Sequence, residues 1–131
     1  MGMWDGFMDE LDAEHGREPR VETIECTKAW TSSEDDLEGL VTLWAIESAQ
    51  PAISRTKLEG LTEHYGLVTG GPGTAYFSLH AELDRHHAAH SRRLIEERAT
   101  DADGERLTAA AERTLSGNWG LLDGVEREFG R

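Results

Sequence analysis

Residues 74–90 read TAYFSLHAELDRHHAAH, and this stretch decides the fold. Apolar side chains recur in it at intervals of three and four residues, a spacing typical of an amphipathic α-helix. His80, Asp84 and His87 stand at positions i, i+4 and i+7, so a helix places all three on one face. Leu83 lies in the same stripe, which is therefore the side that the helix turns towards a protein core.

Three ionisable groups on a core-facing stripe predict a bound metal. Burying such groups costs free energy unless a partner satisfies them. Imidazole and carboxylate are both good ligands for iron, manganese or zinc. A single histidine on such a face is more often a hydrogen-bonded core residue, but three ionisable groups in one register favour the metal. His86 and His90 point away from the stripe, and we expect them to face solvent or to support the ligands.

The same spacing continues along most of the chain and predicts an all-α protein. We expect helices at residues 4–15, 20–31, 34–49, 52–65, 73–99 and 102–129, the last broken near Gly117. Ser32 or Ser33 is the expected N-cap of the third helix, because an acidic residue follows three positions later. Pro51 suits the first turn of the fourth helix, and Gly66 its end. We expect one helical domain over residues 1–131.

Charge and composition limit the partners. Lys and Arg number 13 against 26 Asp and Glu, for a net charge of −13. That field repels nucleic acid and acidic membrane surfaces, so we expect neither as a partner. No apolar run approaches the roughly 18 residues that a membrane span needs. The N-terminus shows no secretory signal and the single Cys26 cannot form an internal disulfide, so we expect a cytoplasmic protein.

Two more residues are candidates for the site. Glu47 is an isolated acid on the apolar stripe of Leu43 and Trp44, and we expect it to be the main carboxylate opposite the histidine helix. The alternative is a partly exposed acid that pairs with Lys57 or Arg55. Lys57 lies on the inner side of its own predicted helix, so its ammonium group could approach the same interior. A lysine that extends its ammonium group into water is the commoner outcome.

Several strings of sequence resemble a known family. They are WAIESAQP at residues 44–51, TKLEGL at 56–61, HYG at 64–66, the H-x-x-x-D-x-x-H pattern at 80–87 and WGLLDGV at 119–125. Together they resemble the haem-oxygenase-like diiron oxidases and oxygenases over roughly residues 34–128. The most similar subgroup contains the chlamydial death-domain-associating protein and relatives of pyrroloquinoline-quinone synthase and the TENA proteins.

The resemblance implies a helical bundle whose core holds two irons bridged by carboxylates. Such enzymes use dioxygen to oxidise a small amine, amino acid or fatty acid. Carried over by position, Glu47, His80, Asp84 and His87 are implied as metal ligands, with iron as the cofactor or manganese in its place. In the branch that forms para-aminobenzoate, the lysine of the T-K-x-x-G segment takes part, which implies a catalytic role for Lys57.

The N-terminal part departs from the family pattern. Family members carry a Glu about two turns ahead of a His in a segment like the one around His15, so His15 is a further candidate ligand. Met8 stands where that Glu would be, which leaves Asp9, Asp12 or no acid as its partner. The resemblance thus describes a bundle that lacks its first helices, whose exposed apolar surface a homodimer would cover. A shortened gene product is the alternative.

Two classes of function follow from these patterns. The first is a non-haem diiron oxidase or oxygenase that acts with O2 on a small organic substrate. The second is a catalytically degenerate helical-bundle binding module with one metal or none, because the N-terminal ligand set is incomplete. A thiaminase-like enzyme without a cofactor would need a nucleophilic cysteine, for which Cys26 is the only candidate.

Overall fold

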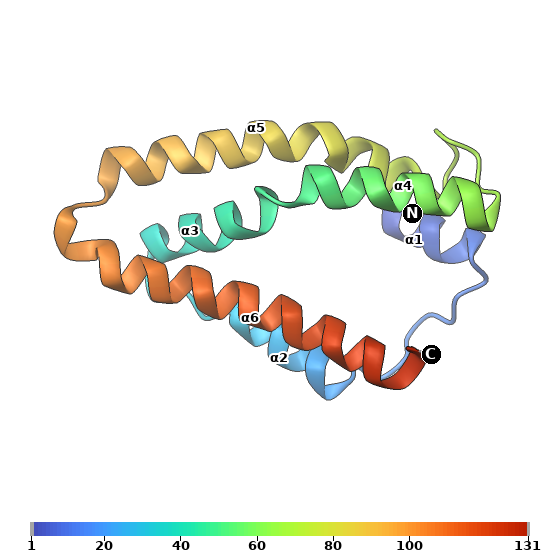
Figure 1. Ribbon diagram of the computed structural model, residues 1–131, viewed down its shortest axis with the longest axis horizontal. Helices are drawn as coiled ribbons and strands as arrows, with labels where there is room; N and C mark the ends of the chain where they lie inside the picture. The colour runs from blue at the N-terminus through green and yellow to red at the C-terminus, as the bar shows by residue number, and fades with distance from the viewer. Residues whose placement is uncertain (1, 131) are drawn as a thin grey trace. The chain divides into compact units, whose positions relative to one another are not determined.

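A computed structural model describes residues 2–130 of the chain. Its helices are α1 (Met3–Glu10), α2 (Val21–Thr31), α3 (Asp36–Glu47), α4 (Gln50–Tyr65), α5 (Ala75–Arg98) and α6 (Gly104–Phe129), with a 3-10 turn, η1 (Asp101–Asp103), before α6 (Figure 1). The described residues contain no strand, so the predicted all-α class is confirmed. None of these helices is long and apolar enough to cross a membrane.

The ends of α4 follow the sequence signals, whereas the predicted end of the first helix is wrong. Pro51 lies in the first turn of α4, and Gly66 ends the helix with a φ of 68°. α1 stops at Glu10 instead of residue 15, because the chain turns sharply at Asp12, whose φ is 51°. His15 therefore lies in a connecting segment and not on a helix.

The start of α3 is capped by a different residue from the two serines that the sequence suggested. The Asp35 carboxylate accepts a hydrogen bond from the Glu38 backbone N–H at 2.9 Å. The Glu38 carboxylate in turn accepts one from the Glu34 backbone N–H at 3.1 Å. A carboxylate at this position satisfies an unpaired N–H of the first turn and interacts favourably with the helix dipole. Ser32 and Ser33 precede this cap.

The chain forms two compact units, residues 2–17 with 47–87 and residues 18–46 with 88–130. They are called the first unit and the second unit below. α5 contributes to both, because its residues up to His87 belong to the first unit and those from Ala88 belong to the second. The prediction of one domain over residues 1–131 includes two terminal residues outside the described range and stays a prediction.

Aromatic side chains hold α1 against the start of α5 in the first unit. The ring centroids of Trp4 and Tyr76 lie 5.1 Å apart, as do those of Phe7 and Phe77. Both pairs meet at steep angles, 75° and 86°, which is the edge-to-face arrangement that aromatic rings prefer. Phe77 is buried at the centre of this cluster. The cluster fixes α1 beside the helix that carries the predicted ligands.

The second unit is built on α2 and α6, which lie side by side (Figure 1). A Cβ atom added at Gly117 would lie only 2.7 Å from the Cβ of Ala29, so the two helices touch where α6 has no side chain. Next to this contact, Asn118 accepts a hydrogen bond from Trp30 Nε1 at 2.7 Å. The predicted break near Gly117 is therefore wrong: α6 continues through it, and the glycine serves close packing.

A buried carboxylate links α3 to α6 in the same unit. Glu38 is 3% exposed, and it accepts hydrogen bonds from Arg106 at 3.3 Å and Arg113 at 3.2 Å. The backbone N–H of Glu34 and the two guanidinium groups lower the pKa of Glu38 and keep it charged. The adjoining apolar core consists of Val41, Leu107 and Ala110 with partly buried Leu37, Ile95, Ala99 and Ala111 around them.

The contact at Gly117 gives a test of the second unit. We expect Gly117→Ala to lower the free energy of unfolding by about 1–3 kcal/mol, because the added methyl group overlaps Ala29. Gly120→Ala, in the same helix with open space around the added methyl group, should raise it by about 1 kcal/mol, the usual gain in helix propensity. Urea denaturation measures both changes. Equal shifts in the two variants would contradict the α2–α6 contact.

Candidate metal centre

Glu47, Asp84 and His87 converge in the first unit. Each offers one ligand atom, and the three atoms lie within 4.8 Å of one another. Glu47 is the last residue of α3, and Asp84 and His87 are one turn apart on α5. Metal–ligand bonds of about 2 Å place ligand atoms roughly 3–4 Å apart, so small side-chain movements bring all three to one ion. This is the only such group found among residues 2–130.

Asp84 is the centre of the group. Its side chain is 4% exposed, and both of its oxygens face His80 Nδ1, at 3.0 and 3.1 Å. Because a carboxylate only accepts hydrogen bonds, Nδ1 of His80 is the donor in this pair. The Tyr76 ring lies against His80 with centroids 4.2 Å apart and restricts its rotation. His80 is thus oriented by Asp84, but it is not part of the group that Glu47, Asp84 and His87 form.

The electrostatics of Glu47 favour a nearby cation. Burial raises the pKa of Glu47, and the Asp84 charge raises it further, against the opposing influence of His87. His87 Nδ1 is 3.4 Å from the Glu47 carboxylate and 3.9 Å from that of Asp84. Two carboxylates with this little solvent destabilise each other in their charged forms. A divalent cation removes that repulsion, so the donor set fits one.

The other residues singled out in the sequence have different surroundings. His15 Nε2 lies 2.8 Å from Asp9 Oδ1, with both side chains about half exposed, so Asp9 is the partner among the alternatives. The pair is not part of the three-residue group. Glu47 pairs with His87 and not with Lys57 or Arg55. Whether these groups bind a metal stays a prediction.

Lys57 lies at a cavity of about 520 Å³ in the first unit. Trp4 and Phe7 line this cavity from α1, and Phe77 lines it from α5. The sequence alone does not predict a role for Trp4 or Phe7, because α1 is short and its contact partner lies some 70 positions away. Their i, i+3 spacing was the one local signal that both rings share a helix face.

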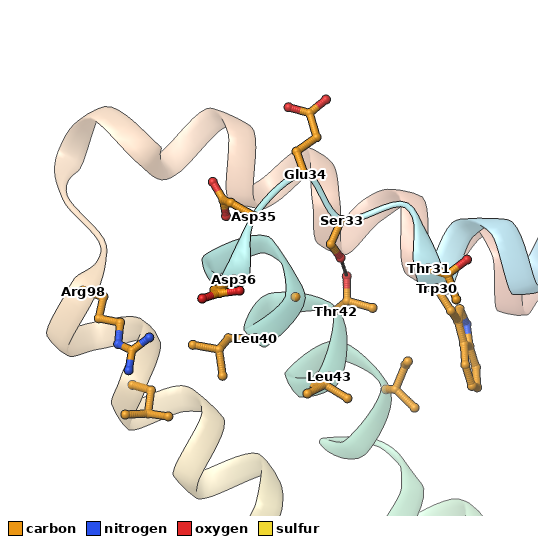
Figure 2. Close-up of a pocket in the computed structure, with 13 residues that line it drawn as sticks. Trp30, Thr31, Ser33, Glu34, Asp35, Asp36, Leu40, Thr42, Leu43 and Arg98 are labelled. Carbon is orange, nitrogen blue, oxygen red and sulfur yellow. Dashed lines mark hydrogen bonds between the residues drawn. The ribbon is translucent and has the colours of Figure 1, made fainter.

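A cavity of about 870 Å³ in the second unit is lined by acidic residues whose position the start of a helix explains (Figure 2). Glu34, Asp35 and Asp36 line it around the start of α3, and Leu40 and Leu43 follow along that helix. Acidic residues are favoured there by the helix dipole, and Asp35 is already engaged as the N-cap. These acids have a structural reason for their position, and the metal prediction concerns the first unit.

Comparison with known proteins identifies the family to which the chain belongs. Residues 3–119 match the model of the iron-containing redox enzymes, a haem-oxygenase-like family, and the chain belongs to this family. The predicted resemblance is thereby confirmed, and iron is the metal that the family implies.

Relatives within this class carry one name, 4-aminobenzoate synthase. The Chlamydia trachomatis protein is 30% identical over 115 residues, which cover 88% of this chain and 49% of the relative. The Chlamydia muridarum protein is 28% identical, with 88% and 48% covered. The Nitrosomonas europaea protein is 25% identical over 135 aligned residues, with 97% and 54% covered. The chain thus spans about half the length of the curated relatives that it matches.

The raised pKa of Glu47 predicts a stability effect in the metal-free protein. Above the folded-state pKa the charged carboxylate opposes folding, whereas below the unfolded-state pKa of about 4.3 Glu47 is neutral in both states and the cost vanishes. We therefore expect Glu47→Gln to raise the melting temperature by roughly 2–4 °C at pH 7 and to have little effect at pH 4 or below.

Thermal unfolding followed by circular dichroism, with metal chelated, measures this difference. Glu63→Gln, which neutralises an exposed acid on α4, is the control and should leave the melting temperature unchanged at both pH values. A lower melting temperature for Glu47→Gln at pH 7 would mean that the His87 contact outweighs burial.

Proposed function

We propose that this chain is a non-haem iron-dependent oxidase or oxygenase that acts with O2 on a small organic substrate. The observation that carries this proposal is the convergence of Glu47, Asp84 and His87 in a chain that belongs to an iron-containing redox family. The family implies iron, and the geometry supplies a place where two carboxylates and an imidazole meet. Neither a helix dipole nor a structural ion pair accounts for the arrangement as well.

The residues around the group have separate roles in this proposal. Glu47, Asp84 and His87 would hold the iron, and His80, which lies beside Asp84, would be a further ligand. Bound iron supplies redox chemistry with dioxygen. Asp84 orients His80 through Nδ1, and the Tyr76 ring packs against the His80 ring.

The proposal also covers the number of metal ions, the product and the role of Lys57. We propose two irons, or manganese in their place, if the N-terminal segment contributes His15 as a ligand. We further propose, from the printed name of the relatives, that the product is 4-aminobenzoate and that Lys57 takes part in forming it. We also propose that the chain is related to the quinone-synthase and TENA branch. We propose a cytoplasmic location and a single-domain organisation as well.

Metal binding tests the site directly. Under anaerobic conditions Fe(II) should bind the wild-type protein, and Asp84→Asn or His87→Ala should each weaken binding by more than roughly 10-fold, because each removes a donor atom. His86→Ala, an exposed neighbour on the same helix, should leave the affinity unchanged. Equilibrium dialysis with metal analysis measures affinity and stoichiometry together.

The stoichiometry separates the two classes of function. About two irons per chain support the diiron oxidase, whereas one or none supports a degenerate binding module. Oxygen uptake by the iron-loaded protein with a reductant, and mass spectrometry for 4-aminobenzoate, then test the activity. Wild-type protein that binds no iron would overturn the proposal.

We also infer that the chain forms a homodimer through α6. Leu115, Trp119, Leu122, Val125 and Phe129 are 41–67% exposed and follow one side of this helix. Gly117 and Gly124, which approach α2, lie on the other side. The five side chains leave an apolar patch of roughly 500 Å². Two such patches meeting about a twofold axis bury roughly 1,000 Å², near the lower limit for a specific interface.

A charge placed on this patch tests the dimer. Leu122→Glu should convert the dimer to a monomer, because each copy would bury an unpaired carboxylate. Val68→Glu, which changes a more exposed apolar residue in the first unit, should leave the dimer intact. Sedimentation velocity measures the oligomeric state. A monomeric wild-type protein at micromolar concentration would contradict the inference.

A further inference from the structure

The aromatic cavity of the first unit has the properties of a ligand site. Its volume of about 520 Å³ lies within the range of roughly 300–1,000 Å³ found for small-molecule sites. Trp4, Phe7 and Phe77 line it, together with Leu61, one of the buried residues of α4. Phe7 and Phe77 are held edge to face, with centroids 5.1 Å apart, so part of the wall is rigid.

Charge distinguishes this cavity from the rest of the molecule. The chain has 26 acidic and 13 basic residues, yet none of the residues that line the cavity is acidic. Lys57 and His64 are its two groups that can carry positive charge. No carboxylate among residues 2–130 forms an ion pair with Lys57. An anion can therefore approach here in spite of the negative net charge.

The two groups lie on the same side of α4. They are seven residues apart, so the helix places them on one face, two turns from each other. Gly60 lies between them, and a Cβ added there would meet nothing within 4 Å. The missing side chain of Gly60 leaves this part of the cavity open. These three residues line the same cavity as the aromatic rings of Trp4, Phe7 and Phe77.

We propose that this cavity binds a small planar aromatic carboxylate, with its ring against Trp4, Phe7 and Phe77 and its carboxylate at Lys57 and His64. The rings give the apolar contact and edge-to-face geometry that a planar ligand needs. The ammonium group gives a charge-assisted hydrogen bond. As a substrate or product site it rests on the proposed function, but binding of the ligand needs no metal.

Binding by the metal-free protein tests the site, with benzoate as the probe. Two analogues separate its features: benzamide keeps the ring without the charge, and cyclohexanecarboxylate keeps the charge without the aromatic ring. We expect benzoate to bind with a Kd of about 1 mM or lower, at least 10-fold more tightly than either analogue. Saturation-transfer NMR detects contact with the ring protons, and titration calorimetry gives the affinities.

Variants of α4 identify the carboxylate partner. Lys57→Gln should reduce benzoate affinity to the level of benzamide, whereas Lys57→Arg should retain most of it. Arg55→Gln removes an exposed charge from the same helix outside the cavity and should change nothing. Phe7→Leu should narrow the difference between benzoate and cyclohexanecarboxylate. Circular dichroism checks that each variant folds, and the retained affinity of Lys57→Arg keeps the test informative if Lys57→Gln unfolds.

Several outcomes would overturn the site. Equal affinities for benzoate and benzamide would exclude a carboxylate anchor, and benzoate binding that both Lys57→Gln and Phe7→Leu leave intact would place the ligand elsewhere. Asp84→Asn separates this proposal from the proposed function, because it should lose iron and keep benzoate. If wild-type protein binds benzoate but no iron, the cavity assignment stands and the oxidase assignment fails; iron binding without benzoate gives the reverse.

Discussion

The Asp84 carboxylate, with only 4% of its side chain exposed, is the constraint on which the first unit's chemistry depends. A charge this far from water needs partners, and the fold gives it His80 at 3.0 Å and His87 at 3.9 Å. Glu47 then brings a second negative charge to the same place, which is unfavourable unless a cation joins them. The unfavourable juxtaposition of two acids is therefore better evidence for a metal centre than any one ligand.

Helix geometry explains which parts of the site could be predicted from the sequence. The relation between Asp84 and His87 is local, because one turn of helix determines it. Glu47 was also predictable, since an acid on an apolar stripe has few favourable surroundings. The position of His15 depends on the turn at Asp12, which ends α1 before residue 15. His15 therefore lies in a connecting segment, where it pairs with Asp9. Turn geometry of that kind has no periodic signal in the sequence.

Contacts between helices explain why Gly117 does not break α6. They also form the aromatic cavity, which no local sequence pattern predicts. Gly117 predicts a helix break by its low helix propensity, yet the contact with Ala29 makes the same lack of a side chain necessary inside an unbroken α6. The aromatic cavity likewise exists only because Trp4 and Phe7 of α1 meet Phe77 of α5. The sequence predicted the helices well, whereas it could not predict which helices would meet.

One face of α5 carries both a residue of the aromatic cavity and a residue of the candidate metal centre. Phe77, which forms the cavity wall, and Asp84, which anchors the ligand group, are seven residues apart on α5, so they share a face about 10 Å apart along the axis. In the proposed site, a ring bound beside Phe77 lies on the side of the helix that carries the candidate metal ligands. Lys57 of α4 lines the same cavity as Phe77, so in the proposed site the carboxylate of a bound ring is attracted to the cavity by this ammonium group.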